Sequence, residues 1–107
     1  MSIRAEWEPG DPGTSPHRHS GPAFDYVVEG AVRFEQECEP ERVVEAGGTL
    51  WEPGGDMIHC QDGSALRDAW TRFIVTMMCA PGKPMLELVS DEELEQRAHL
   101  RAPRPTE

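Results

Sequence analysis

The sequence contains little positive charge and no long apolar run. Only 10 of its 107 residues are Lys or Arg, against 20 Asp or Glu, so the formal net charge is -10, and Lys83 is the only lysine. Nucleic acids and anionic membrane surfaces are bound through clustered Lys and Arg, so we expect neither as a partner. A membrane-spanning helix needs about 20 consecutive apolar residues, and the sequence has no such stretch.

Cysteine is also scarce. The three cysteines, Cys38, Cys60 and Cys79, form an odd set without the regular spacing of a disulfide framework. The first residues of the chain contain no apolar core of the kind that a secretion signal has. We therefore expect reduced thiols and a cytoplasmic protein.

Glycine and proline, by contrast, are frequent, with ten of each. They separate short stretches rich in β-branched and aromatic residues, such as residues 23–28, 31–35 and 70–78. Many short strands between Gly and Pro turns are typical of a β-sandwich or β-barrel. A chain of 107 residues suffices for one domain with a single core. We predict one all-β domain over residues 1–100 and a flexible tail over residues 101–107.

The order of the elements can be predicted in outline. Ser90 and Glu93 form a capping box, in which each can satisfy an unpaired backbone N–H, and this predicts one short helix near the C-terminal end. Glu29-Gly30 is expected to form a hairpin turn. Strands are expected over residues 3–7, 17–19, 24–28, 31–36, 42–45, 49–52, 57–61, 72–79 and 85–89.

Three of the four histidines provide the main functional clue. His17 and His19 flank Arg18, and on an extended segment they point to the same side because side chains alternate with period 2. His59 follows a Gly-rich turn and could complete one face of a metal ion. Neutral imidazole suits Fe, Zn, Ni and Mn. An open three-histidine site favours catalysis over a structural role; the alternative is that these are polar histidines at a barrel mouth without a ligand. Arg18 itself should point outward and pair with a carboxylate.

Two segments resemble the paired signatures of the cupin superfamily. Residues 16–30 resemble the first signature, and residues 46–59 resemble the second. The resemblance implies a jelly-roll β-barrel of short antiparallel strands, in which His17, His19 and His59 bind a divalent metal. The sequence departs from the first signature where a glutamate ligand usually stands four or five residues after the second histidine, because positions 23 and 24 are Ala and Phe.

Two residues could compensate for the missing carboxylate. Asp25 has the same strand parity as Ala23 and could point inward, although a solvated strand residue is the alternative. Gln61 has the same parity as His59 and could orient a metal-bound water or a substrate oxygen, with a polar strand-end residue as the alternative. An apolar lining for the pocket is expected from Phe24, Tyr26, Trp51, Phe73, Met77 and Met78.

These features predict a metal-dependent enzyme that acts on a small oxygen-rich organic molecule. Dioxygenase-like chemistry is the first interpretation, and a polyketide cyclase or isomerase is the second. A non-enzymatic cupin that binds a small ligand or a metal is a third, because the sequence shows no obvious general base besides the histidines. The exposed edges of a small sheet need covering, so we also expect a homodimer that pairs through edge strands, with Trp7 and Trp70 at the contact.

Overall fold

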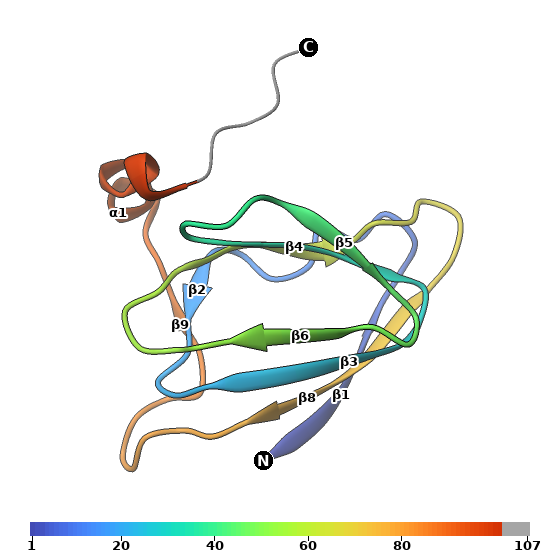
Figure 1. Ribbon diagram of the computed structural model, residues 1–107, viewed down its shortest axis with the longest axis horizontal. Coiled ribbons are helices and arrows are strands. Elements are labelled where there is room, and N and C mark those ends of the chain that lie inside the picture. The colour runs from blue at the N-terminus through green and yellow to red at the C-terminus, as the bar shows by residue number, and fades with distance from the viewer. Residues whose placement is uncertain (102–107) are drawn as a thin grey trace.

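The computed structural model describes residues 1–101. Two antiparallel sheets face one another, with strand orders β1-β8-β3-β6 and β5-β4-β7-β2-β9, and a short helix follows them (Figure 1). The all-β jelly roll expected from the sequence is confirmed. Its elements are β1 (Ser2–Trp7), β2 (His17–Arg18), β3 (Ala23–Glu29), β4 (Ala31–Gln36), β5 (Arg42–Glu45), β6 (Thr49–Glu52), β7 (His59–Ser64), β8 (Thr71–Met77), β9 (Glu87–Leu88), the helix α1 (Asp91–Gln96) and the 3-10 turn η1 (Ala98–Leu100).

The core lies between the two sheets and follows the alternation of the strands. On β3, Ala23, Asp25 and Val27 are buried and the residues between them are exposed. Their partners on β8 continue the same inner layer, because Val27 pairs with Phe73. Trp7 packs against Phe73 with ring centroids 4.6 Å apart. The core cluster consists of Trp7, Ala23, Val27, Val32, Phe34, Leu50, Phe73, Val75 and Met77.

This alternation corrects part of the predicted apolar lining. Phe73 and Met77 face inward, as expected. Four other residues are exposed on the outer side of the β1-β8-β3-β6 sheet: Phe24, Tyr26, Trp51 and Met78. The reason is parity: Phe24, Tyr26 and Trp51 alternate with inward-facing residues of their strands, and Met78 directly follows the inward-facing Met77 at the end of β8. Trp7 belongs to the core, so its predicted place in a contact between copies is also wrong.

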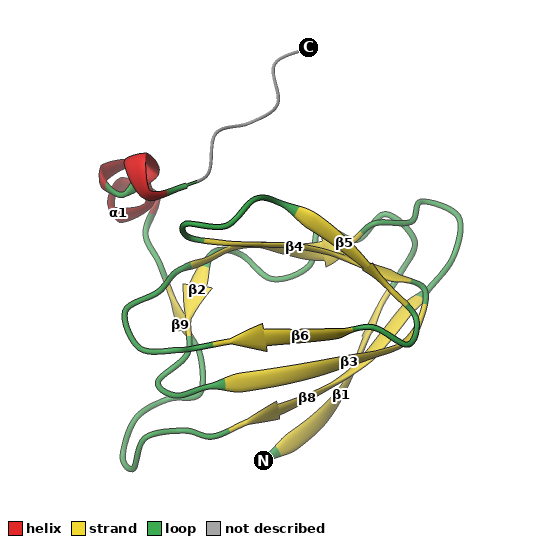
Figure 2. Cartoon of the chain, in the orientation of Figure 1, coloured by secondary structure: helices red, strands yellow, loops and turns green. Residues whose placement is uncertain are grey.

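The shortest strands bring the histidine segments together. β2 contains only two residues and lies between β7 and β9, where His17 pairs with His59 on one side and with Leu88 on the other. Figure 2 shows β2 and β9 side by side at one end of the molecule, next to the loop that follows β6. Segments that are far apart in the sequence therefore meet at one end of the barrel.

The C-terminal segment is attached to the second sheet by ion pairs. Ser90 caps α1 by accepting a hydrogen bond from the Glu93 N–H, as predicted. Arg97 then binds Glu37, and Arg101 binds Glu35. Arg101 is thus anchored, whereas residues 102–107 of the predicted flexible tail lie outside the described part of the chain. Within residues 1–101, no helix has the length and apolar character required to cross a membrane.

Candidate metal centre

Four buried side chains converge inside the barrel: His17, His19, Glu52 and His59. One potential ligand atom from each lies within 4.8 Å of those of the other three. The fold explains this meeting, because His17 and His59 are paired on adjacent strands. His19 follows on the same side of its segment, and Glu52 reaches the same point from the end of β6. The structure therefore brings the three predicted histidines together and adds a carboxylate.

Backbone carbonyl groups orient two of the imidazoles. His17 Nδ1 lies 2.8 Å from the Ser15 carbonyl oxygen, and His19 Nδ1 lies 2.9 Å from that of Met85. A carbonyl oxygen only accepts, so each Nδ1 must donate its proton. In the neutral rings, each Nε2 then keeps a free lone pair for the centre. This arrangement is the usual support of metal-binding histidines.

The contacts of the other two candidate ligands, Glu52 and His59, are better explained by a bound cation than by hydrogen bonds between the two side chains. Glu52 Oε1 lies 3.0 Å from His19 Nε2 and 2.5 Å from His59 Nδ1. Yet neither Glu52 Oε1 nor either ring nitrogen of His59 has a partner with hydrogen-bond geometry in the described structure. Buried polar atoms without partners are rare and costly. Three imidazoles and one carboxylate suit a divalent transition metal, so the chain has a buried candidate metal site of three histidines and one glutamate.

Glu52 was not predicted as a site residue. In the β3–β6 pair it lies directly opposite Ala23, the position at which the resemblance leads one to expect a glutamate. The neighbouring strand therefore supplies the carboxylate from across the pair. Its inward direction could be read from its parity with the apolar Leu50, but the pairing of β3 with β6 joins segments that are not consecutive strands, and a single sequence does not show it.

A β-bulge in β7 determines which residue after His59 faces the metal centre. Glu35 pairs with Gln61 and Gln36 pairs with His59, so β7 contains one extra residue, Cys60, between these pairs. A bulge of this kind reverses the alternation beyond it. Asp62 consequently lines the cavity beside the metal centre. Gln61 points elsewhere and donates a hydrogen bond to Glu35, so its predicted place in the cavity is wrong.

Two further carboxylates border the centre. Asp25, only 3% exposed, faces inward as predicted, and its Oδ1 has no hydrogen-bond partner in the described structure. It is not one of the four converging ligand residues. Asp62 Oδ1 lies 4.0 Å from His59 Nε2. A carboxylate near the second nitrogen of a ligating histidine is a common way to orient the ring.

All of these residues except His59 line one cavity of about 120 Å³. Its floor is polar, with His17, His19 and the three carboxylates of Asp25, Glu52 and Asp62. Its walls are mainly apolar side chains of β1 and β8 together with Leu86, and no Lys or Arg within residues 1–101 lines it. Ile3 and Leu86 line the cavity and are themselves exposed, so they mark its mouth.

Burial and mutual charge shift the proton affinities of these groups. Burial, with the charges of Glu52 and Asp62, raises the pKa of Asp25 to about 8. Burial also raises the pKa of Asp62 to about 6. Burial alone would raise the pKa of Glu52, but close contacts with His19 and His59 outweigh it and lower the pKa to about 2. The carboxylate at the metal centre therefore stays ionised, while Asp25 binds a proton readily.

The pKa values of the three imidazoles shift in different directions. Burial, reinforced by the neighbouring His59, lowers the pKa of His17 to about 4. Burial also acts to lower the pKa of His19 and of His59, but Glu52 outweighs it and the pKa of each is raised. Neutral His17 is therefore ready to act as a ligand, whereas metal binding at the other two must compete with protons.

We expect Asp25→Asn to stabilise the metal-free protein in a pH-dependent way. The folded pKa of Asp25 is about 8 against a usual 3.8, so between these values the folded state binds more protons than the unfolded state and stability falls as pH rises. Asparagine cannot ionise, so its advantage should be small near pH 4 and should grow up to about pH 8, where it should reach about 1 kcal/mol or more.

Chemical denaturation of the metal-free protein at both ends of this pH range measures the effect. Asp68→Asn, a substitution of an exposed loop aspartate, is the matched control and should change the free energy of unfolding little at either pH. An equal gain for Asp25→Asn at both ends would contradict the expectation.

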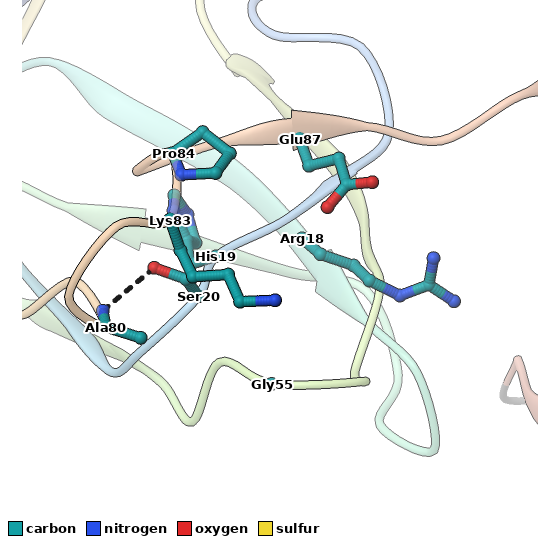
Figure 3. Close-up of a pocket in the computed structure, with 8 residues that line it drawn as sticks. All are labelled: Arg18, His19, Ser20, Gly55, Ala80, Lys83, Pro84 and Glu87. Carbon is teal, nitrogen blue, oxygen red and sulfur yellow. Dashed lines mark hydrogen bonds between the residues drawn. The ribbon is translucent and has the colours of Figure 1, made fainter.

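A second hollow, of about 230 Å³, shares only His19 with the cavity (Figure 3). Lys83 extends into it, while the Arg18 guanidinium points away from His19. Arg18 instead forms ion pairs with Glu93 at 2.8 Å and with Asp56 at 3.6 Å, which confirms its expected outward direction and pairing. Glu87 also lines this hollow and offsets the charge of Lys83, so with Arg18 already paired the hollow has no unpaired cation with which to hold an anion.

Comparison with known proteins places the fold. No protein-family model matches the sequence, and no curated protein sequence matches it. A cupin-like protein from Thermotoga maritima is similar in structure, with a TM-score of 0.68 and 21% identity over 90% of this chain and 71% of the other. A chain from the DMSP lyases RdDddP and RnDddQII also has a TM-score of 0.68, with 22% identity over 83% of this chain and 43% of the other.

KdgF from a Halomonas species is similar at a TM-score of 0.55 and 26% identity, over 70% of this chain and 66% of its own length. The chain thus spans less than half of the lyase and about two thirds of KdgF. These likenesses establish a cupin-like fold, as the two sequence signatures implied.

Proposed function

We propose that the protein is a metal-dependent enzyme that moves a proton on a small organic substrate, in a reaction of the isomerase or lyase type. One observation carries this proposal: Asp25, a buried carboxylate outside the four-residue ligand set, lines the same small cavity as three members of that set, His17, His19 and Glu52. A general base must reach the substrate without being consumed as a ligand. Asp25 meets this condition.

The ligand residues and the base have separate roles. His17, His19, Glu52 and His59 would hold the ion. A divalent cation bound there supplies Lewis acidity, which polarises a carbonyl or carboxylate oxygen and acidifies the adjacent C–H group. Asp62, near His59 Nε2, acts as a positioning residue for that imidazole.

Asp25 performs the proton transfer. Its ionised carboxylate takes the proton from the carbon next to the carbonyl group, and the electron pair of the C–H bond passes to that carbonyl. In a substrate with a C=C bond beyond this carbon, the electron pair extends to the far alkene carbon; protonated Asp25 returns the proton there as the C=O bond re-forms, so the double bond has moved and the product is an isomer. If the next carbon instead holds a leaving group, that group departs with its own bonding pair, the enolate pair forms a C=C bond, and Asp25 releases its proton to solvent, which is an elimination. Burial raises the pKa of Asp25 in the metal-free protein, so its carboxylate is a stronger base than a solvated one, which supports this role.

The cavity suggests the kind of substrate. About 120 Å³ with apolar walls admits a small molecule with one oxygen-bearing end and a short apolar remainder. Since no cation within residues 1–101 lines the cavity, we expect no recognition of a second anionic group. The same fold is found in a chain described as a DMSP lyase, so it accommodates this class of chemistry.

Hydrogen exchange at carbon tests the proposal. The protein is purified without added metal, its metal content is measured, and small carbonyl compounds such as acetylacetone and acetoacetate are incubated with it in D2O. NMR should show metal-dependent deuterium incorporation next to the carbonyl group. Asp25→Asn should abolish this exchange while retaining the metal, and Asp68→Asn should preserve both.

Other results would favour the other interpretations. Consumption of dioxygen that survives in Asp25→Asn would overturn proton transfer in favour of dioxygenase chemistry. Metal retention with tight binding of a probe, but without exchange or oxygen uptake, would favour a non-enzymatic binding protein.

A further inference from the structure

The outer face of the β1-β8-β3-β6 sheet contains a continuous apolar surface. Six large side chains on it are between 42% and 58% exposed. Phe24 lies opposite Trp51 on one neighbouring strand, and Tyr26 lies opposite Ile74 on the other. They are therefore cross-strand neighbours. We call this set the apolar face: Phe24, Tyr26, Val28, Trp51, Ile74 and Met78.

The acidic surplus of the chain is missing from this face. The other outward positions on β6 and β8 are occupied by Thr49, Thr76 and Arg72. At the rim, Arg72 forms an ion pair with Glu29, and Arg4 forms one with Glu6 at 3.1 Å. These charges cancel in pairs, although the whole chain has a net charge of -10. Two copies that repel each other elsewhere can approach here.

We propose that the apolar face is the interface of a homodimer, in which each copy covers the face of the other. A half-exposed large side chain presents roughly 100 Å², so the six together present about 600 Å². With the threonines and the rim, this approaches the roughly 800 Å² per partner of a stable interface. An apolar patch of this size is at the upper limit of what monomers expose.

The shape of the face suits pairing with itself. A shallow groove of about 250 Å³ lies at one corner, lined by Arg4, Val28, Arg72 and Ile74 together with Phe73. Trp51 projects from β6, at the opposite edge of the sheet from β1. A twofold axis in the plane of the interface would place Trp51 of each copy over the groove of the other. Such reciprocal contacts are what an isologous dimer requires.

This arrangement differs from pairing through edge strands. The edge strand β1 contains Ile3 at the mouth of the cavity, so pairing along β1 would bring a second chain close to that mouth. The apolar face lies on the other side of the sheet and leaves the mouth open. Trp70 stacks under the Arg72 guanidinium at 5.4 Å, so it borders the apolar face at its rim. Nucleic acid or an anionic membrane would need a basic surplus, and none is present on the face.

Sedimentation over a range of protein concentrations tests the proposal. The full-length protein should be a dimer at micromolar concentrations. Val28→Glu should weaken the dimer by more than about 100-fold, because each copy would have to dehydrate an added carboxylate, and the neighbouring Arg4 and Arg72 are already paired with Glu6 and Glu29. Val43→Glu is the matched control: Val43 and Val28 are both 50% exposed, but Val43 lies on β5 of the other sheet. It should leave the dimer intact.

Trp51→Glu is a second variant in case Val28→Glu fails to fold, and circular dichroism shows whether each variant is folded. A wild-type protein that sediments as a monomer throughout would overturn the proposal. So would a dimer that persists in both face variants, since it would be held by another surface. None of these results depends on metal binding or on activity, so they leave the proposed function untouched.

Discussion

Glu52→Gln should release the metal. The substitution keeps the size of the side chain but removes the charged ligand that lies 3.0 Å from His19 Nε2. Loss of outer-shell partners alone typically lowers metal affinity by about 10- to 100-fold, and we expect the loss of a ligand to exceed about 100-fold. Competition with a chelator, followed by metal analysis, measures the change. Glu87→Gln, a substitution near the outer side of His19, should retain the metal.

Moving the carboxylate from position 52 to position 23 tests the same ligand assignment more stringently. Ala23 lies opposite Glu52 on the neighbouring strand, and opposite side chains in an antiparallel pair begin only about 5 Å apart. The double variant Ala23→Glu with Glu52→Ala should therefore recover part of the metal affinity that Glu52→Ala loses. Recovery will be incomplete, because Ala23 is fully buried and a larger side chain strains the core. Full metal retention by Glu52→Gln would show that Glu52 is not a ligand.

Arg97→Ala should weaken both the fold and the metal centre. Arg97 donates to both carboxylate oxygens of Glu37, at 2.6 and 2.9 Å. Glu37 is buried and also accepts the Ile58 N–H at 3.0 Å, next to His59. Without Arg97, a buried carboxylate loses its cation, which should cost about 2 kcal/mol of unfolding free energy. Metal affinity should fall by about 10-fold, as for an outer-shell partner.

A double-mutant cycle separates the ion pair from general damage. Glu37→Gln can still accept the Ile58 N–H but has no charge to leave unpaired. The combination of Arg97→Ala with Glu37→Gln should therefore be less destabilised than Arg97→Ala alone. Urea denaturation of the metal-free proteins gives the free energies. If the effects of the two substitutions on the free energy of unfolding are simply additive, Arg97 and Glu37 are not energetically coupled.

The sequence predicted the architecture well, because its signals are local. The spacing of Gly and Pro turns indicated short strands, and Ser90 with Glu93 indicated the short helix α1. The two histidine segments were visible because their residue types and spacing are themselves the signal. The direction of Asp25 followed from its parity with Ala23, since both lie on the same regular strand.

The positions of the other two carboxylates, Glu52 and Asp62, depend on strand contacts that a single sequence does not reveal. Glu52 reaches the histidines because β6 pairs with β3, and Asp62 replaces Gln61 because Cys60 adds one residue to β7. Parity arguments fail at such a bulge, since one extra residue exchanges the two faces of a strand.

By itself, then, the amino-acid order determined an acidic all-β domain with three histidines placed for one site. The tertiary structure alone decided which carboxylate joins them in the candidate metal site, which carboxylate lies beside that site, and which aromatic residues face outward. The physical reason is that residue type and alternation act within a strand, whereas register and strand neighbours arise only when distant segments pair.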